Sequence, residues 1–175
     1  LNKTSLFLLG NTGATIVAVC NNCSTFASIF IAGITTTMLT ILAVLHGEED
    51  LQGLKEVFKR ALKLTLLASV IMLAVFEGLP GLVVAVFGIS GDSLRTMGIL
   101  AVRLFGLSLP LYALVHIFMS FYQAIGQKSY SICIVVGEGV VFMLPSVFLL
   151  SKIGTANGLG LWLSFACAEV VTLIF

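Results

Sequence analysis

Long apolar runs separated by short polar stretches dominate this chain. No residue from Thr4 to Leu45 carries a charge. A helix needs about 20 apolar residues to cross the hydrocarbon core of a bilayer, so this run is about twice the length of one span. The sequence Gly-Asn-Thr-Gly at 10–13 favours a break within the run. We therefore expect the tail of a first helix over 1–9, followed by one long helix over about 14–45.

The rest of the chain repeats this alternation. Between Leu54 and Leu62, apolar residues recur at three- and four-residue spacing, which predicts a helix that begins as an amphipathic segment and continues into the membrane. Glycine, proline and charged residues mark the other helix ends. The further helices predicted are 54–87, 94–125, 130–150 and 159–175. The chain is therefore predicted to be all-α, a polytopic membrane helix bundle with about five transmembrane helices.

Composition strengthens this prediction. Of the 175 residues, 59% are hydrophobic and 10% are charged, and the mean hydropathy is +1.15. A soluble domain usually carries about 25% charged residues, so a soluble protein this apolar would lack the polar groups to cover its surface. Lipid solvates such side chains, and the bilayer is an expected partner. The net charge of +1 gives no strong attraction to nucleic acid, which is not an expected partner.

The two ends of the chain suggest a part of a larger protein. The first residue is Leu1 rather than methionine, and Phe175 lies inside an apolar run. We expect residues 1–175 to be a piece of a longer polypeptide that continues at both ends.

Basic residues near helix ends predict the orientation of the bundle. If the helices alternate in direction, the loop 46–63 and the turn 126–128 lie on the same side and together carry five basic residues. The opposite side carries three, at Lys3, Arg95 and Lys152. Because cytoplasmic loops are enriched in lysine and arginine, we expect the loop 46–63 to be cytoplasmic.

Glu138 is the clearest candidate for chemistry inside the membrane. It lies about eight residues into its predicted helix, or about 12 Å deep at 1.5 Å per residue. A charge at mid-membrane costs at least about 2.5–3.5 kcal/mol, so such acids are rare and usually functional. Removal from water favours the neutral, protonated carboxyl, which makes Glu138 a candidate proton carrier. The alternative is a structural acid that is protonated or paired with a neighbouring helix.

Two further charged residues fall inside predicted spans. Glu169 lies about ten residues into the last predicted helix, where pairing with another lobe and a role in transport are both open. Arg103 lies near the start of its helix, so its long side chain can reach the membrane interface, and a structural role is favoured. An ion pair between Arg103 and either Glu138 or Glu169 is a further hypothesis.

Prolines and asparagines add a second group of candidates. Pro110 and Pro145 each remove one backbone hydrogen bond, which predicts helix kinks that serve either as hinges or as static bends. Asn21 and Asn22 lie in the long first helix, where buried amides need partners. They are predicted to line a polar cavity or to bond helix to helix.

No motif of an enzyme or of a metal site stands out. Cys20 and Cys23 have the C-x-x-C spacing but lie in an apolar helix without a second pair, so we interpret them as small buried hydrophobic residues. His46 precedes an acidic run that is better explained as a solvated loop, and His116 is a lone histidine in a helix. The sequence therefore predicts neither an enzyme nor a bound metal or cofactor.

Several segments in a fixed order resemble a known family. They are Val-Leu-His-Gly-Glu-Glu-Asp at 44–50, Leu-Lys-Glu-Val-Phe-Lys-Arg-Ala at 54–61, Val-Phe-Gly at 86–88, Leu-Ala-Val-Arg-Leu-Phe-Gly-Leu-Ser-Leu-Pro at 100–110 and Tyr-Gln-Ala-Ile-Gly-Gln-Lys at 122–128. Each is unspecific alone, but their order and spacing hold across nearly the whole chain. Together they resemble the C-terminal lobe of a bacterial multidrug and toxic compound extrusion (MATE) transporter.

This resemblance implies an architecture and a function. Members of the family have twelve helices in two lobes and alternate access between the two sides of the membrane. The implied function is export of small organic cations, coupled to inward flow of H⁺ or Na⁺, in the bacterial inner membrane. Residues 1–175 would then be a single transmembrane lobe, and the implied partner is the other lobe of the same polypeptide. Some members carry a coupling aspartate in the fourth helix of a lobe, but 96–123 contains no acid here. Glu138, one helix later, is either a substitute or structural.

Two alternatives remain from the sequence. A flippase of the same superfamily, which moves lipid-linked oligosaccharides, would need a basic cavity to grip pyrophosphate. Arg103 is the only deep base, which favours cation export. A membrane enzyme or a non-catalytic membrane subunit is the other alternative, and an enzyme should show a clustered set of reactive groups.

Overall fold

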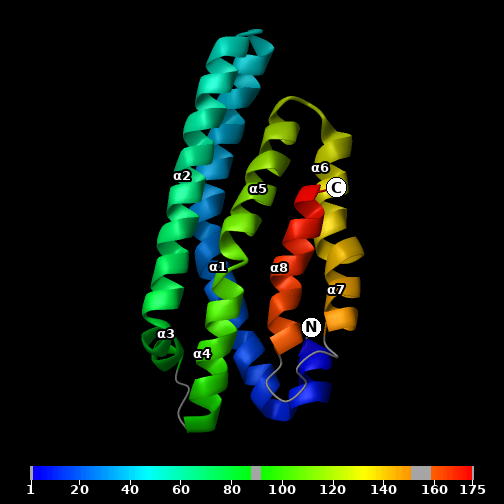
Figure 1. Cartoon of the computed structure of the whole chain (residues 1–175). Helices are drawn as coiled ribbons and strands as arrows, with labels where there is room; N and C mark the ends of the chain where they lie inside the picture. Colours follow the sequence, from blue (N-terminus) through cyan, green and yellow to red (C-terminus); the bar gives the residue numbers. More distant parts are fainter. Residues whose placement is uncertain (1, 88–91, 151–158, 175) are drawn as a thin grey trace.

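The computed structural model of the protein is a bundle of long helices (Figure 1). It describes residues 2–87, 92–150 and 159–174, without the side chains of 2–12, 14, 93, 159 and 161. The elements are α1 (Asn2–Gly47), α2 (Leu51–Gly78), α3 (Pro80–Val86), α4 (Asp92–Gly106), α5 (Leu109–Ala124), α6 (Lys128–Val136), the π-helical η1 (Gly137–Phe142), α7 (Met143–Leu150) and α8 (Leu159–Ile174). These described residues contain no strand.

The helices are long and apolar enough to cross a membrane. Four such segments are present among the described residues, with a shorter apolar helix at Trp162–Ile174. The four are Thr15–Gly47, Leu51–Gly78, Leu94–Ala124 and Lys128–Leu150. The predicted all-α membrane helix bundle is therefore confirmed.

The predicted break at 10–13 is wrong, because α1 continues through this segment. Glycine and asparagine lower helix propensity by at most about 1 kcal/mol each. Neither removes a backbone hydrogen bond, as proline would. The expected tail at 1–9 is thus, over its described residues, part of one helix of 46 residues. In Figure 1 the first turns of α1 bend away from the rest, so the helix changes direction near its start although its assignment as helix is unbroken.

Two of the predicted helices are divided at prolines. The segment predicted as 54–87 is split at Leu79, before Pro80. The segment predicted as 94–125 is split between Gly106 and Leu109, before Pro110. Each proline lies in the first turn of its helix, where a missing N–H leaves no intrahelical bond unmade. Pro110 therefore marks a helix start rather than a kink inside a helix.

The segment predicted as 130–150 contains a wide turn. Residues Gly137–Phe142 are π-helical, and Pro145 follows three residues later in α7. Pro145 has no backbone N–H to donate to the carbonyl of Val141, so the helix lacks one backbone hydrogen bond at this point. Such π segments are often found at functional sites. The irregularity predicted at Pro145 is thus centred on the preceding turn, which contains Glu138.

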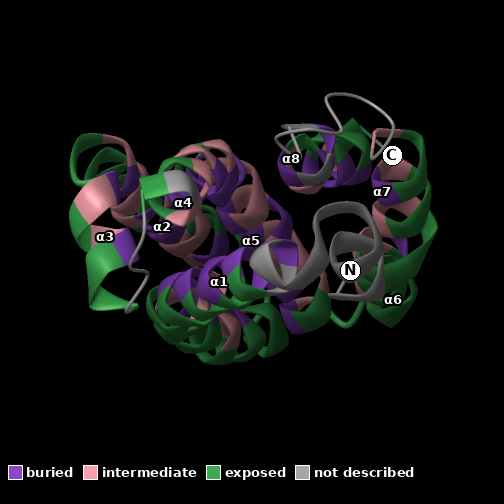
Figure 2. Ribbon diagram, turned by 90° about the horizontal axis from the view of Figure 1, so that it is seen from below, coloured by how far each residue is buried: buried purple, intermediate pink, exposed green. Residues whose placement is uncertain are grey.

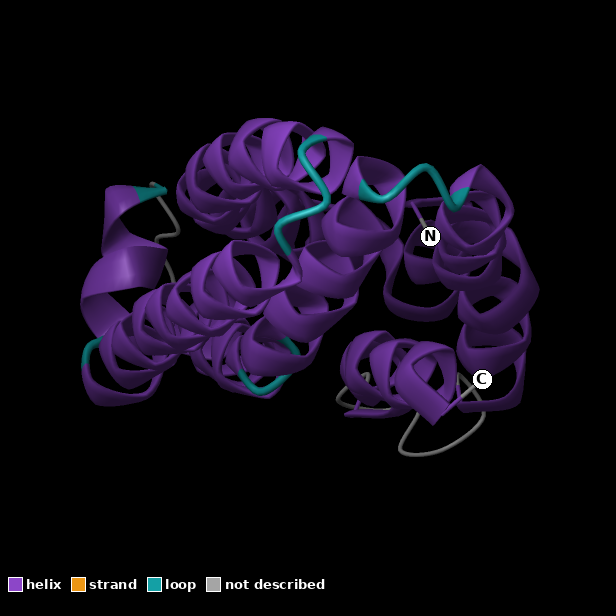
Figure 3. Ribbon diagram, turned by 90° about the horizontal axis from the view of Figure 1, so that it is seen from above, coloured by secondary structure: helices purple, strands orange, loops and turns teal. Residues whose placement is uncertain are grey.

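The helices pack around α5, with α1 and α2 on one side and α6 and α8 on the other, and η1 packs against α8. Buried residues face the middle of the bundle and exposed residues face outward (Figure 2). One apolar cluster joins α1, α2 and α5 and includes Met38, Leu42 and Ile117. A second surrounds the fully buried Trp162. The loops after α1 and after α5 lie at the same end of the bundle (Figure 3), as the alternation of helices predicts.

Candidate ion site in the helix bundle

One face of α5 carries polar residues at every fourth position. They are Ser108, Tyr112, His116 and Ser120, and Ser108 stands at the N-cap position. Residues four apart lie on the same face of an α-helix, so these side chains form a stripe along the helix. Ser108 and Ser120 are buried, at 3% and 5% exposure. The stripe therefore faces the interior of the bundle rather than lipid.

Two cavities lie along this stripe. The first, of about 320 Å³, lies between α1 and α5 and is lined by Ser28, Thr35 and His116 among others. The second, of about 210 Å³, lies between α1, α5, η1 and α8, and we call it the carboxylate cavity. Its polar lining residues are Ser24, Ser108, Tyr112, Glu138 and Glu169. Tyr112 lines both cavities and separates them.

Glu138 lies opposite the α5 stripe. Its Oε1 atom is 3.6 Å from Nε2 of His116, and the two side chains are only 20% and 25% exposed. The Tyr112 and His116 rings pack with their centroids 4.1 Å apart. The π-helical turn positions Glu138 at the carboxylate cavity. A protonated histidine would form an ion pair with this carboxylate, and a neutral one would weaken it.

Glu169 supplies the second carboxyl group of the cavity. It is 8% exposed, and its Oε2 atom has no hydrogen-bond partner among the described atoms. The nearby Thr172 hydroxyl donates to the backbone carbonyl of Ala168 instead. Burying a carboxylate without a partner costs several kcal/mol, on the order of the penalty for any isolated buried charge. This oxygen is therefore suited to a proton or to a bound cation.

Arg103 pairs elsewhere. Its Nε atom is 3.6 Å from Oε2 of Glu77 at the end of α2, and both side chains are partly exposed. The hypothesis that Arg103 pairs with Glu138 or Glu169 is therefore wrong. Arg103 precedes the break between α4 and α5, so it lies beside the end of α2 and not along the α5 stripe. The structural role favoured for Arg103 stays a prediction.

Asn21 and Asn22 are exposed on the outside of the described bundle. Neither lines the two cavities along α5. The hydroxyl of Thr25 donates to the backbone carbonyl of Asn21, a bond within α1. The asparagines therefore present their amides to whatever covers this face of α1, and cavity lining between two lobes stays a prediction.

Sequence reasoning missed Tyr112 and His116. His116 looked like a lone histidine because its partner, Glu138, lies in a different helix. The signal that identifies both residues is the four-residue spacing from Ser108 to Ser120, since a polar stripe on an otherwise apolar membrane helix must face protein. The identity of the facing helices cannot be obtained from that spacing.

A family model for MatE matches residues 4–149. The chain belongs to the MatE family. MATE proteins are integral membrane transporters and not, in general, enzymes. No match was found among curated proteins. The family assignment covers the α5 stripe and Glu138 but stops before Glu169 in α8.

Solved MATE structures share this fold. An outward-facing multidrug resistance MATE transporter of the MOP superfamily matches with a TM-score of 0.90 at 17% identity, over 99% of this chain and 39% of that chain. An inward-facing one matches with a TM-score of 0.89 at 16% identity, over 99% and 40%. A MOP superfamily transporter from Pyrococcus furiosus matches at 0.84 and 16%, over 99% and 40%. The chain thus spans about two fifths of these structures, and its fold fits both access states equally well.

Proposed function

We propose that this MATE chain is the C-terminal lobe of a two-lobe exporter of organic cations, driven by antiport of H⁺ or Na⁺ with alternating access. Glu138 and Glu169 bind the coupling cation in the carboxylate cavity. The observation that carries this proposal is that Glu169, whose buried Oε2 has no hydrogen-bond partner in the described structure, lines the same cavity as Glu138.

The chemistry of the cavity favours a small cation. Two acids line it, and its described lining residues include no lysine or arginine. Two carboxylates that share a desolvated site do not both remain charged unless a cation joins them, because their charges repel. A bound proton or Na⁺ relieves this repulsion, and its release restores it. Such an acidic lining is unsuited to the pyrophosphate of a lipid-linked oligosaccharide, so cation export is preferred to the flippase alternative.

His116 and Tyr112 complete the proposed mechanism. When Glu138 is charged, a protonated His116, with its Nε2 atom 3.6 Å from Oε1 of Glu138, stabilises it and holds η1 against α5. When Glu138 takes a proton, this attraction is lost and the two segments are free to separate. The backbone hydrogen bonding around η1 is irregular, so we expect such a movement to occur there. We further propose that the loop 46–63 faces the cytoplasm and that the protein is located in the bacterial inner membrane.

The test is transport by the full-length protein in liposomes, with tetraphenylphosphonium as the exported probe. A pH gradient without Na⁺ and a Na⁺ gradient without a pH difference are imposed in separate experiments. We expect one gradient to drive export, and both Glu138→Gln and Glu169→Gln to reduce the driven rate by about tenfold or more, since each removes an intramembrane group that carries the coupling charge.

The matched control is Glu56→Gln. Glu56 is an exposed acid of α2 that pairs with Arg60 at 3.9 Å, far from the carboxylate cavity in sequence and outside its lining. This variant should export at the wild-type rate. Wild-type rates with an unchanged dependence on pH and Na⁺ in both cavity variants would disprove the proposed coupling site.

A further inference from the structure

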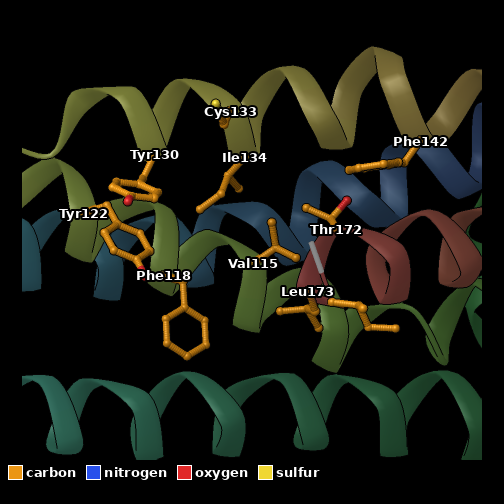
Figure 4. Close-up of a pocket in the computed structure, with 10 residues that line it drawn as sticks. Val115, Phe118, Tyr122, Tyr130, Cys133, Ile134, Phe142, Thr172 and Leu173 are labelled. Carbon is orange, nitrogen blue, oxygen red and sulfur yellow. The ribbon is translucent and has the colours of Figure 1, made fainter.

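A third cavity, separate from the carboxylate cavity, lies between α5, α6, η1 and α8 (Figure 4). Its volume is about 450 Å³, within the range of about 300–1,000 Å³ that is usual for small-molecule sites. The ten residues that line it are Val115, Phe118, Tyr122, Tyr130, Cys133, Ile134, Phe142, Thr172, Leu173 and Ile174. We call it the aromatic pocket.

Aromatic rings from three elements form its walls. Tyr122 of α5 and Tyr130 of α6 stack at one end, with ring centroids 5.3 Å apart and planes 25° apart. Phe142 of η1 lies toward the other end (Figure 4). Phe118 of α5 borders the pocket, but its ring points toward α2 and packs against Phe58, with centroids 5.8 Å apart. Rings supplied by separate helices present several faces to one volume, and such faces attract cations as well as apolar groups.

The charges near the pocket are negative and lie just behind its wall. None of its ten lining residues is charged. Glu138 is four residues from Ile134 and four from Phe142, and Glu169 is three residues before Thr172. Both acids therefore lie about one helical turn along the chain from pocket residues, and both line the neighbouring carboxylate cavity.

This arrangement selects a particular kind of ligand. A small hard ion needs direct oxygen ligands, which the carboxylate cavity supplies and the aromatic pocket does not. A neutral apolar molecule gains nothing from the nearby acids. A monovalent cation whose charge is spread over apolar or aromatic groups gains from both the rings and the field of the two carboxylates.

We propose that the aromatic pocket binds the apolar, aromatic body of a monovalent organic cation. This inference rests on the proposed export function and adds the place within the lobe where such a substrate binds. This position also accounts for antiport. The substrate cation and the coupling cation would both be attracted by Glu138 and Glu169, so the binding of one would weaken the binding of the other.

A cysteine of the pocket can be used to detect ligand binding by chemical labelling. Cys133 lines it and is exposed, whereas Cys20 and Cys23 are buried. In full-length protein carrying Cys167→Ser and no other reactive cysteine outside this chain, a maleimide should label Cys133. We expect saturating tetraphenylphosphonium to slow this labelling at least about fivefold, because the bound cation covers the thiol.

Affinity measurements make the test specific. Equilibrium binding of tetraphenylphosphonium should weaken about tenfold in Tyr130→Leu, which removes a stacked ring, a loss of about 1.4 kcal/mol. Tyr130→Phe keeps the ring and should bind like the wild type. Phe26→Leu, which alters the exposed Phe26 and Phe30 pair on α1 outside the pocket, is the matched control and should also be unchanged.

The outcomes separate this inference from the proposed function. Unslowed labelling of Cys133, or unchanged affinity in Tyr130→Leu, overturns the aromatic pocket as a cation site even if Glu169→Gln still abolishes coupling. Equal protection of Cys133 by a neutral single-chain lipid also overturns it and identifies an acyl-chain site. Slowed labelling with the expected pattern of affinities supports it, whichever gradient drives transport.

Discussion

The two sides of α5 differ in how they are filled. Toward α1 and α2, Ile117 is fully buried in an apolar cluster, and the Phe58 and Phe121 rings lie 4.7 Å apart. Toward η1 and α8, the same helix borders the carboxylate cavity and the aromatic pocket. A single 16-residue helix therefore joins a filled side, packed against α2 and the C-terminal part of α1, to a hollow side with these two cavities. The cavity between α1 and α5 lies along the polar stripe that separates the two sides.

We interpret the difference as a separation of stability, on the filled side, from the proposed binding of cations, on the hollow side. In lipid, helix association depends on close packing and on hydrogen bonds between helices rather than on removal of apolar groups from water. Where α5 packs against α2 and the C-terminal part of α1, apolar side chains such as Met38, Leu42 and Ile117 satisfy the requirement for close packing. The hollow side leaves space and an unpartnered carboxyl oxygen on Glu169, features that reduce stability unless a ligand uses them.

The largest expected effect comes from truncating the filled side. Ile117→Ala should lower the free energy of unfolding by about 2–3 kcal/mol, because its neighbours lose contacts and a void remains. Val115→Ala, two residues away on α5 and equally buried, should cost only about 1 kcal/mol, since Val115 already borders the aromatic pocket. Equilibrium unfolding in detergent measures both. A greater loss at Val115 than at Ile117 would reverse the comparison.

A second, smaller effect tests the π-helical segment. A Cβ at Gly137 would lie 2.9 Å from Cε2 of Phe142, whereas a Cβ at Gly139 would meet nothing within 4 Å. Gly137→Ala should therefore destabilise the protein by about 1–2 kcal/mol, the usual cost of overpacking. It should also weaken tetraphenylphosphonium binding, since Phe142 lines the aromatic pocket.

Gly139→Ala is the control for this effect, because it flanks Glu138 on the other side. It should be neutral or slightly stabilising, as alanine is the better helix former. Equal losses of stability in the two variants would show that the backbone of η1, rather than the position of the Phe142 ring, limits this segment.

The smallest effect concerns the start of α2, which packs on the filled side of α5 and is stabilised by a hydrogen bond between residues close in sequence. The Asp50 side chain accepts a hydrogen bond from the backbone N–H of Gly53 at 2.9 Å and caps α2. Asp50→Ala should cost about 1 kcal/mol of unfolding free energy, and Asp50→Asn, an equally good cap, should cost much less. Export should be unchanged in both. A transport defect in Asp50→Ala would indicate that the loop after α1 is coupled to the hollow side.

Features that depend on neighbouring residues could be predicted from the sequence, whereas features that depend on residues far apart in the chain could not. The uncharged run from Thr4 to Leu45 predicted a membrane helix because partition into lipid depends on the side chains alone. The break at 10–13 was wrong because propensity is a weak local term that a continuous helix overrides. Pro110 was correctly identified as an interruption, yet the sequence did not show that it begins a separate helix.

The sequence by itself determined the class of this protein, its helices and its family, since hydrophobic runs, prolines and ordered motifs are local features of the chain. It also identified Glu138 and Glu169, because an acid in lipid is costly wherever it lies. Only the tertiary structure decided that Glu138 is beside His116, that Glu169 shares its cavity, and that Arg103 pairs with Glu77. These neighbours come from separate helices, and the distances between helices are determined by packing across the whole lobe, which no local pattern records.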